Sequence, residues 1–451
     1  MTADTPIADE PRAKVTPVVT LTPREQRLQK AGSILRWGAT INSVFTLLVL
    51  IVAILAAATS AEMFSTGADL TLALYGGASD TALLVVILLL LGNISLLLVT
   101  MIGVQAQEIW ALLLTWVVTI GNIVLLATLG FTPAIITILA AGLAAATVTR
   151  DVRAFRLNPV MLKELRERMR GARAFVVITV YLGLMSGFTV LVYLLQRGVV
   201  QTGGSSVTGE LGRTLFEGVF GLELLLIIFI APAFTAGSVS NERERKTYDL
   251  LQITLLPKPS FVIGKLESAL SYIFLLLLAA IPLQSIAFLF GGVSQTELVL
   301  AFVILGITAI ALGTVGMYFS TTVERTLTAS VRSYTVAFIT TIGVPIVLWF
   351  FVSAFNSAVS GTAANVAKST VVEAIIMYIG ALVVSLNPVF TASATQQLLI
   401  NKQEMGFWTA TLSNGDKIPM VSPWISFTII YLVISTVLIV LAVREMRRAD
   451  M

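Results

Sequence analysis

Runs of about 20 apolar residues recur along the whole 451-residue chain, and they constrain its fold more than any other feature. A helix of that length crosses the hydrocarbon core of a bilayer while satisfying its own backbone hydrogen bonds. Only 12% of the residues are charged, whereas a soluble protein has about a quarter. The sequence therefore predicts an all-α polytopic membrane protein.

The apolar runs predict ten transmembrane helices and one shorter element. The expected spans are 37–59, 81–104, 109–129, 133–149, 174–195, 214–238, 266–290, 298–319, 334–355 and 425–443. A further run, 371–386, is too short to cross comfortably and is followed by Asn387-Pro388. We expect a re-entrant or outer-face helix there, because backbone that stops inside a bilayer must be covered by protein or line a cavity.

Basic residues give the expected orientation, since Lys and Arg concentrate on the cytoplasmic side of membrane proteins. With the N-terminus inside, ten alternating spans place all but five of the 29 Lys and Arg residues on the inner side. The five exceptions are Arg197, Arg213, Lys368, Lys402 and Lys417. If 371–386 also crossed, the basic C-terminal residues would move outside. We therefore expect a multi-pass protein of the cell membrane with both termini cytoplasmic.

The spans fall into two groups. Residues 1–36 are polar and hold four prolines, which predicts a disordered cytoplasmic tail and no cleavable signal peptide. Residues 37–149 form a predicted four-helix accessory membrane domain, and 158–451 form a six-helix domain. The groups differ in number of spans and share no convincing repeat, so an inverted-repeat transporter is not favoured.

The absence of two residue types excludes several kinds of chemistry. The chain has no Cys and no His. Disulfides, thiol chemistry, imidazole catalysis and the commonest zinc, copper and haem ligands are therefore excluded. We expect no metal site and no cofactor on this chain, and no nucleic-acid partner.

A short basic amphipathic helix is predicted just before the fifth span. Asn158 suits the N-cap and Pro159 the first helical position. Met161, Leu165 and Met169 share one face. The opposite face carries Lys163, Arg166, Arg170 and Arg173. Such a helix is expected to lie in the inner interface with its cations near anionic headgroups, although ordinary positive-inside flanking is the alternative.

The connection 241–265 is unlike the apolar spans on either side of it. It holds five basic and three acidic residues. We expect one helix from Glu242 to Leu256, with Glu at its positive end and an apolar face formed by Tyr248, Leu251 and Leu255. A cytoplasmic helix of this kind is expected to dock on the membrane surface, on the protein's own core or on another protein, with its charges serving docking rather than the fold. A solvated loop without a special role is the alternative.

These residues resemble the loop that follows the second span in many permeases of the type-2 class of ABC exporters. That pattern reads E-R-E-x-G-T-h-E-x-L-x-h-T-P-L-S, where h is apolar, followed by G-K. The matching residues here are Glu242, Arg243, Glu244, Thr247, Tyr248, Asp249, Leu251, Ile253, Thr254, Leu256, Gly264 and Lys265. The sequence departs from it with Lys246 for Gly, Leu255 for Pro and Pro257 for Ser. The stretch from Asn158 is similar to the elbow helix of these permeases, so the resemblance covers about 158–451 and leaves the first four spans outside.

The resemblance implies the permease subunit of an ABC transporter that moves a substrate across the membrane, in the direction of export. It also implies that 242–256 is a coupling helix that inserts into a separate ATPase, with the permease working as a homodimer or beside a related permease. The only Gly-Lys pair, Gly264-Lys265, lacks the following Ser/Thr and the earlier Gly of a phosphate-binding loop. We therefore expect ATP and Mg²⁺ to bind the partner, and this chain not to be an enzyme.

Polar residues inside the spans are candidates for a transport pathway. Glu223, Gln284, Asn93 and Asn122 qualify by depth, and each can equally be an interhelical hydrogen bond. Two other classes of function stay open. One is an ion-gradient-driven secondary transporter or channel, which needs buried acidic or basic residues in facing spans. The other is a non-transporting membrane scaffold with a permease fold.

Overall fold

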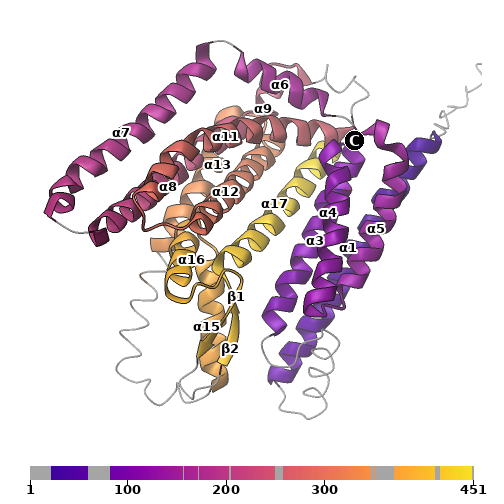
Figure 1. Ribbon diagram of the computed structural model, residues 1–451. Helices are drawn as coiled ribbons and strands as arrows, with labels where there is room; N and C mark the ends of the chain where they lie inside the picture. The colour runs from indigo at the N-terminus through magenta and orange to yellow at the C-terminus, as the bar shows by residue number, and fades with distance from the viewer. Residues whose placement is uncertain are drawn as a thin grey trace, which may run out of the picture.

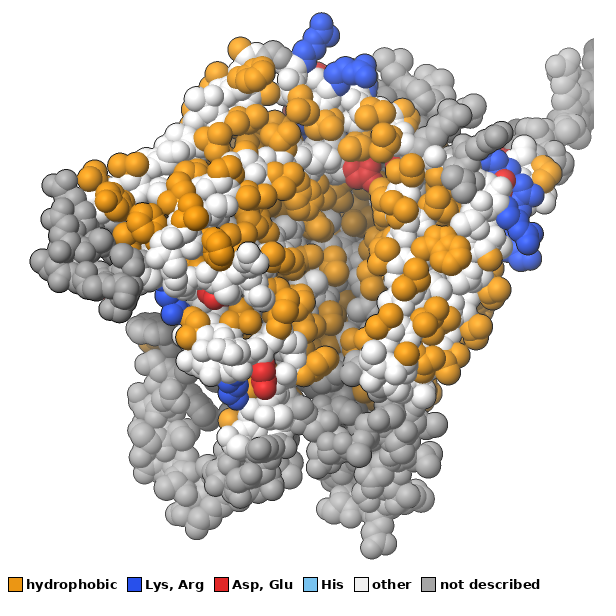
Figure 2. Space-filling view, viewed as in Figure 1, with side chains coloured by type: hydrophobic (Ala, Val, Ile, Leu, Met, Phe, Trp, Pro, Cys, Tyr) orange, Lys and Arg blue, Asp and Glu red, His pale blue; other side chains and the backbone are white. Residues whose placement is uncertain are grey.

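The computed structural model describes residues 22–58, 82–155, 157–170, 172–202, 205–248, 257–346, 350, 370–411 and 417–448. Within these ranges, nine helices are long and apolar enough to cross a membrane, and the number rises to ten if one bent pair is a single span. The protein is thus a multi-pass membrane protein built almost entirely of helices. Figure 2 shows hydrophobic side chains over the middle of the surface and Lys and Arg side chains towards its edges.

The first four long helices form a group of their own, on the right in Figure 1. They are α1 (Pro23–Ala58), α3 (Ala82–Ala106), α4 (Ile109–Leu129) and α5 (Ala134–Val148). A Cβ atom at Gly38 of α1 would lie 2.4 Å from the Cβ of Ala140, so the missing side chain lets α1 approach α5 closely. Gly130 ends α4 in the left-handed conformation, with φ 62°, and begins the short turn into α5.

Helix α1 begins well before the first predicted span. The side chain of Glu25 accepts hydrogen bonds from the backbone N and hydroxyl of Thr22, and the Glu25 N–H donates to the Thr22 hydroxyl, which is a capping box. The first turns then bury Leu28 and Leu35 in the four-helix core. The prediction of a disordered tail through residue 36 is therefore wrong for residues 23–36, because they carry a cap and an apolar stripe. Residues 1–21 lie outside the described residues.

The second group surrounds α12 (Gln295–Thr322). Its other members are α7 (Ala172–Thr202), α8 (Ser205–Thr235), α11 (Lys258–Leu289), α13 (Thr326–Phe338) and α17 (Pro423–Arg448). In Figure 1, α7 leans away from the other helices of this group. Helix α13 continues into one π-helical turn, η2 (Ile339–Gly343). Much of the remainder of the predicted span 334–355 lies outside the described residues.

A bent pair of helices lies on the side of the molecule away from α6, the helix at the top of Figure 1. Helix α15 (Thr370–Val384) ends just before Asn387-Pro388, as predicted, and α16 (Pro388–Lys402) follows it. The chain bends by 119° between the segments Met377–Val384 and Pro388–Lys402. Neither α16 nor the antiparallel hairpin of β1 (Phe407–Thr411) and β2 (Lys417–Val421) was predicted from the sequence.

The two groups touch along α3, which packs against α11 and α17. The hydroxyls of Ser95 in α3 and Thr436 in α17 lie 2.7 Å apart, and Ile429 of α17 packs beside Gly92 on the same helix α3. Ile102 and Ile263 share a smaller apolar cluster between α3 and α11. The first group is therefore held against the second by both polar and apolar contacts.

Candidate functional site

Helix α6 (Pro159–Met169) crosses one end of the second group (Figure 1). It begins as predicted, because the side chain of Asn158 accepts from the N–H of Val160 at 2.9 Å and Pro159 takes the first position. Its cations Lys163, Arg166 and Arg170 are exposed, while Met161 and Leu165 are half-buried. Arg173 stands at the start of α7, and its side chain lies outside the described residues. The helix is therefore amphipathic and separate from α7, and its place at a membrane surface remains a prediction.

The N-cap of α6 sits directly on α11. Asn158 is buried, and its Nδ2 donates to the carbonyl oxygen of Ser260 and to Oε1 of Glu108, both at 2.6 Å. A Cβ atom at Gly264 would lie 2.6 Å from the same amide. The Gly of the Gly-Lys pair is thus a packing residue that makes room for the cap of α6.

Lys265 joins three segments that are far apart in the sequence. Its side chain is 3% exposed, and Nζ lies 2.8 Å from Oε1 of Glu164 in α6 and 3.3 Å from Oε1 of Glu242 in α9 (Ser240–Glu244). A buried ammonium is stable only when it is paired and hydrogen-bonded, and two carboxylates meet that requirement here. Lys265 therefore holds the connection after α8 against both α6 and α11.

The connection makes a sharp turn rather than one long helix. Lys246 N–H donates to the carbonyl of Arg243 and Thr247 N–H to that of Glu242, both at 3.0 Å, with Lys246 at φ 56°. This is the hydrogen-bond pattern of a Schellman C-cap, which normally has Gly at the left-handed position. The predicted continuous helix from Glu242 is wrong in its described part, because this C-cap ends α9 at Glu244. The predicted positions Asp249, Leu251, Ile253, Thr254, Leu255 and Leu256 lie outside the described residues.

Two further residues of the motif are part of the fold. The carboxylate of Glu244 accepts from the N–H of Thr326 at 2.8 Å and from its hydroxyl at 2.5 Å, so it caps the start of α13. Tyr248 is buried among residues of α11, α12 and α17, with the Arg243 guanidinium 5.2 Å from its ring centre. The expectation that these charges serve docking rather than the fold is therefore wrong for Glu244. Arg245 and Lys246 are exposed at the tip of the turn.

An open cavity of about 1060 Å³ lies between α6, α9 and the start of α11. Both signs of charge line it, with Arg168, Arg170 and Arg245 beside Glu164 and Glu242. Burial lowers the pKa of Arg168 from its ordinary value, and the nearby charge of Glu164 opposes that change. The α6 end of the second group therefore presents a large polar space beside the turn.

A second contact between the two helix groups, in which Glu108 and Trp110 lie beside Glu267, was not predicted from the sequence. Glu108 lies in the turn between α3 and α4 and is 2% exposed. Burial, followed by the negative charge of Glu267 in α11, raises its pKa to about 7. The indole N–H of Trp110 donates to the Glu267 carboxylate. In the sequence, the one sign of this contact was Glu108 itself, an acidic residue in the short connection between two apolar spans.

The four polar residues inside the spans pair with one another. Gln284 Nε2 donates to a carboxylate oxygen of Glu223 at 2.5 Å, joining α11 to α8. The amides of Asn93 and Asn122 exchange hydrogen bonds of 2.9 and 3.0 Å between α3 and α4. These are interhelical hydrogen bonds, one of the two interpretations that the sequence left open. A transport role for these residues stays a prediction.

No protein-family model matches this sequence, and a search of the curated proteins finds no match either. Within the part of the chain that the structure describes, no three His, Cys, Asp or Glu side chains come together as metal ligands would. The class that the fold defines is a helical multi-pass membrane protein in which buried polar contacts join α6, α9 and α11.

Proposed function

We propose that this chain is the permease subunit of an ABC exporter, driven by a separate ATPase subunit that docks on the turn after α9. The observation that carries the proposal is the contact network of Gly264 and Lys265. Lys265, at the end of the motif, pairs with Glu242 at its beginning, and Gly264 receives the cap of α6. The three segments on which the resemblance rests therefore form one structural unit: the helix from Asn158, the charged stretch from Glu242 and the Gly264-Lys265 pair.

The main departure from the family pattern also supports the proposal. The pattern has Gly where this chain has Lys246, and Lys246 adopts φ 56°, a conformation that Gly enters without steric cost. The cost for another L-residue is about 1–2 kcal/mol. The chain therefore keeps the backbone shape that the pattern's Gly favours, and it places a cation at the exposed tip.

The contacts suggest how force could pass from an ATPase to the spans. Arg245 and Lys246 are exposed and can meet carboxylates on a partner, where charge complementarity sets orientation. Behind them, Lys265 ties the connection to α6 and α11, and Glu244 ties it to the start of α13. A displacement of the turn would then be carried to three helices, while ATP and Mg²⁺ stay on the partner.

Site-specific crosslinking tests this proposal. A photo-crosslinking residue at position 245 or 246 should capture an ATP-hydrolysing subunit of about 25–35 kDa, the size of one nucleotide-binding domain. The matched control is position 404, an exposed residue just after α16 on the side away from α6. The same adduct at 404, or no ATPase adduct at 245 and 246 in cells that express the chain, would overturn the proposal.

The two alternative classes make different predictions in this experiment. A scaffold or an ion-gradient-driven transporter yields no ATPase adduct. A gradient-driven mechanism also uses carboxylates whose charge changes during transport, and Glu223 contacts the neutral amide of Gln284. No described contact favours either alternative over the ATPase-driven permease.

A further inference from the structure

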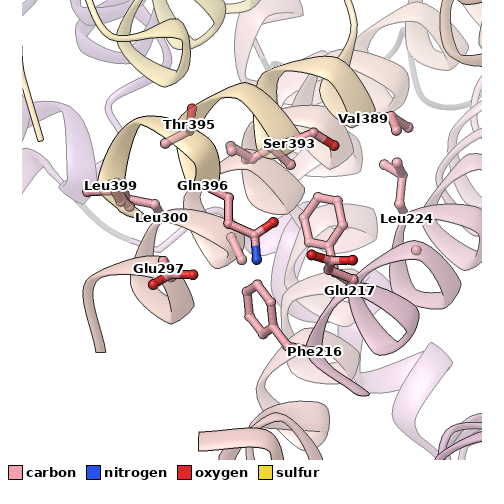
Figure 3. A pocket seen from close by; sticks show the side chains of 15 residues that line it. Phe216, Glu217, Leu224, Glu297, Leu300, Val389, Ser393, Thr395, Gln396 and Leu399 are labelled. Atoms are coloured by element: carbon pink, nitrogen blue, oxygen red, sulfur yellow. The ribbon is translucent and has the colours of Figure 1, made fainter. Parts of the chain in front are cut away.

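A small cavity of about 160 Å³ lies between α8, α12 and α16 (Figure 3), and Lys265 is not among its lining residues. Its apolar wall consists of Phe216, Phe220, Leu224, Leu300 and Ile304, together with smaller residues of α16. A cavity of about 150 Å³ lined by such side chains holds one benzene molecule. The space therefore fits an organic molecule with an apolar body of about that size.

The other wall of this cavity is polar and incompletely satisfied. Glu297 is 8% exposed and completes a capping box at the start of α12. Its Oε1 accepts from the backbone N–H of Ser294 at 3.1 Å and from the Ser294 hydroxyl at 2.9 Å. Its Oε2 is buried and has no hydrogen-bond partner among the described residues, as is true of Thr395 Oγ1 and Gln396 Nε2. Leaving a buried polar atom unpaired costs about 1–3 kcal/mol, and more for a charged group.

The lining favours a positive charge. Its described ionisable residues are Glu217 and Glu297, and no Lys or Arg among the described residues lines the cavity. Arg213 lies 3.2 Å from Glu217 and pairs with it, so Glu297, whose Oε2 has no hydrogen-bond partner among the described residues, is the carboxylate that a bound cation would meet. The rings of Phe216 and Phe220 add faces that attract cations.

We propose that this cavity binds a small amphipathic primary amine as its ammonium ion. The ammonium group donates to Oε2 of Glu297 and to the hydroxyl of Thr395, and the apolar body lies against Phe216 and Phe220. Gln396 reaches from α16 towards the same space (Figure 3). A half-turn of its amide replaces nitrogen by oxygen and supplies a third acceptor. The proposal does not rest on the ATPase-driven function, because the site lies wholly within this chain.

Equilibrium dialysis of the purified chain in detergent tests the site, with benzylamine as the probe and empty micelles subtracted. An eight-atom ligand is expected to bind with a Kd on the order of 1 mM. Benzyl alcohol has the same size without the charge, and it should bind at least about 10-fold more weakly, because hydrogen bonds to charged groups are the stronger ones. Equal binding of the two probes would overturn the proposal.

Three variants locate the binding. Glu297→Gln should weaken benzylamine binding at least about 10-fold, while Gln at this helix position still completes the capping box. Ala392→Leu should block the cavity sterically and leave the charge in place. The matched control Glu210→Gln removes an exposed carboxylate of α8 outside the lining, so it should bind like the unchanged chain. Unchanged affinity in a folded Glu297→Gln protein would refute the assignment.

The ammonium group can belong to a free amine or to a lipid headgroup. Nanodiscs separate these sources. If bilayers with ethanolamine headgroups displace benzylamine and those with choline headgroups do not, the occupant is the lipid headgroup. If neither displaces it, the occupant is a free amine. Equal displacement by both would contradict a site that selects a primary ammonium.

Discussion

A Cβ atom at Gly264 would lie 2.6 Å from the side-chain amide of Asn158, although the two residues are more than 100 positions apart. Gly264→Ala should therefore push the N-cap of α6 off α11. We expect a loss of about 1–3 kcal/mol, the usual cost of overpacking. Thermal unfolding in detergent measures this effect. Gly183→Ala is the control, because a Cβ there meets no atom within 4 Å and should leave stability unchanged or slightly higher.

Lys265→Met should loosen the connection after α8, the segment that contains α9. The substitution leaves the carboxylates of Glu164 and Glu242 without their shared cation, and breaking a buried ion pair costs about 3–5 kcal/mol. Faster trypsin cleavage after Arg245 and a lower melting temperature would follow. The matched change Lys30→Met, at an exposed site on α1, should alter neither measurement. Equal trypsin resistance of the two variants would contradict the anchoring role.

The contact between the two helix groups should weaken as the pH rises. The pKa of Glu108 is raised from 4.5 to about 7 in the folded protein, so the folded chain binds this proton more tightly than the unfolded chain. The stability it contributes is therefore complete below about pH 4.5 and is lost as the pH rises through about 7. The full change is on the order of 3 kcal/mol.

Glu108→Gln should flatten this dependence, because an amide keeps a neutral side chain at every pH. The difference in melting temperature between the variant and the unchanged chain, followed from pH 5 to 8, reports Glu108 together with its charged neighbour Glu267 and removes the contribution of more distant titrating groups. Glu404→Gln, an exposed carboxylate after α16, serves as the control. A pH profile that is the same with and without Glu108 would rule out this interpretation.

Asn387 should hold the bent pair against α13. Its Oδ1 accepts from the N–H groups of Val389 and Phe390, and its Nδ2 donates to the carbonyls of Thr340 and Thr341 at the π-helical turn. Asn387→Ala loses both sets of bonds, and we expect a cost of about 2–4 kcal/mol. Asn387→Ser keeps a cap and should recover about 1 kcal/mol. Hydrogen exchange of residues 339–346 should rise in both variants, and an unchanged rate would disprove the link.

Cysteine labelling should place the two ends of the molecule on opposite sides of the membrane. The chain has no Cys of its own, so single replacements report without background. Arg245→Cys and Arg325→Cys should react only from the inner side, and Glu404→Cys only from outside, as the basic-residue distribution predicts. Reaction of all three from the same side would overturn the ten-span orientation and the re-entrant interpretation of α15 and α16.

Local patterns were enough for much of the helix inventory. The apolar runs predicted α4 at its observed bounds, Asn158-Pro159 marked where α6 begins, and Asn387-Pro388 marked where the helix before it, α15, ends. Errors arose where a cap changed the outcome. Thr22 and Glu25 start α1 before its apolar run, and the turn at Lys246 ends α9 where the charge pattern suggested a longer helix.

The sequence by itself determined that this is a helical membrane protein, because hydropathy and helix caps depend on neighbouring residues. Only the tertiary structure decided which polar groups meet. Lys265 pairs with carboxylates of α6 and α9, and Asn158 joins Glu108 to α11, across separations that no local pattern encodes. The physical reason is desolvation: a charge or amide inside the packed helices must find a partner, and which partner it finds depends on how distant helices cross.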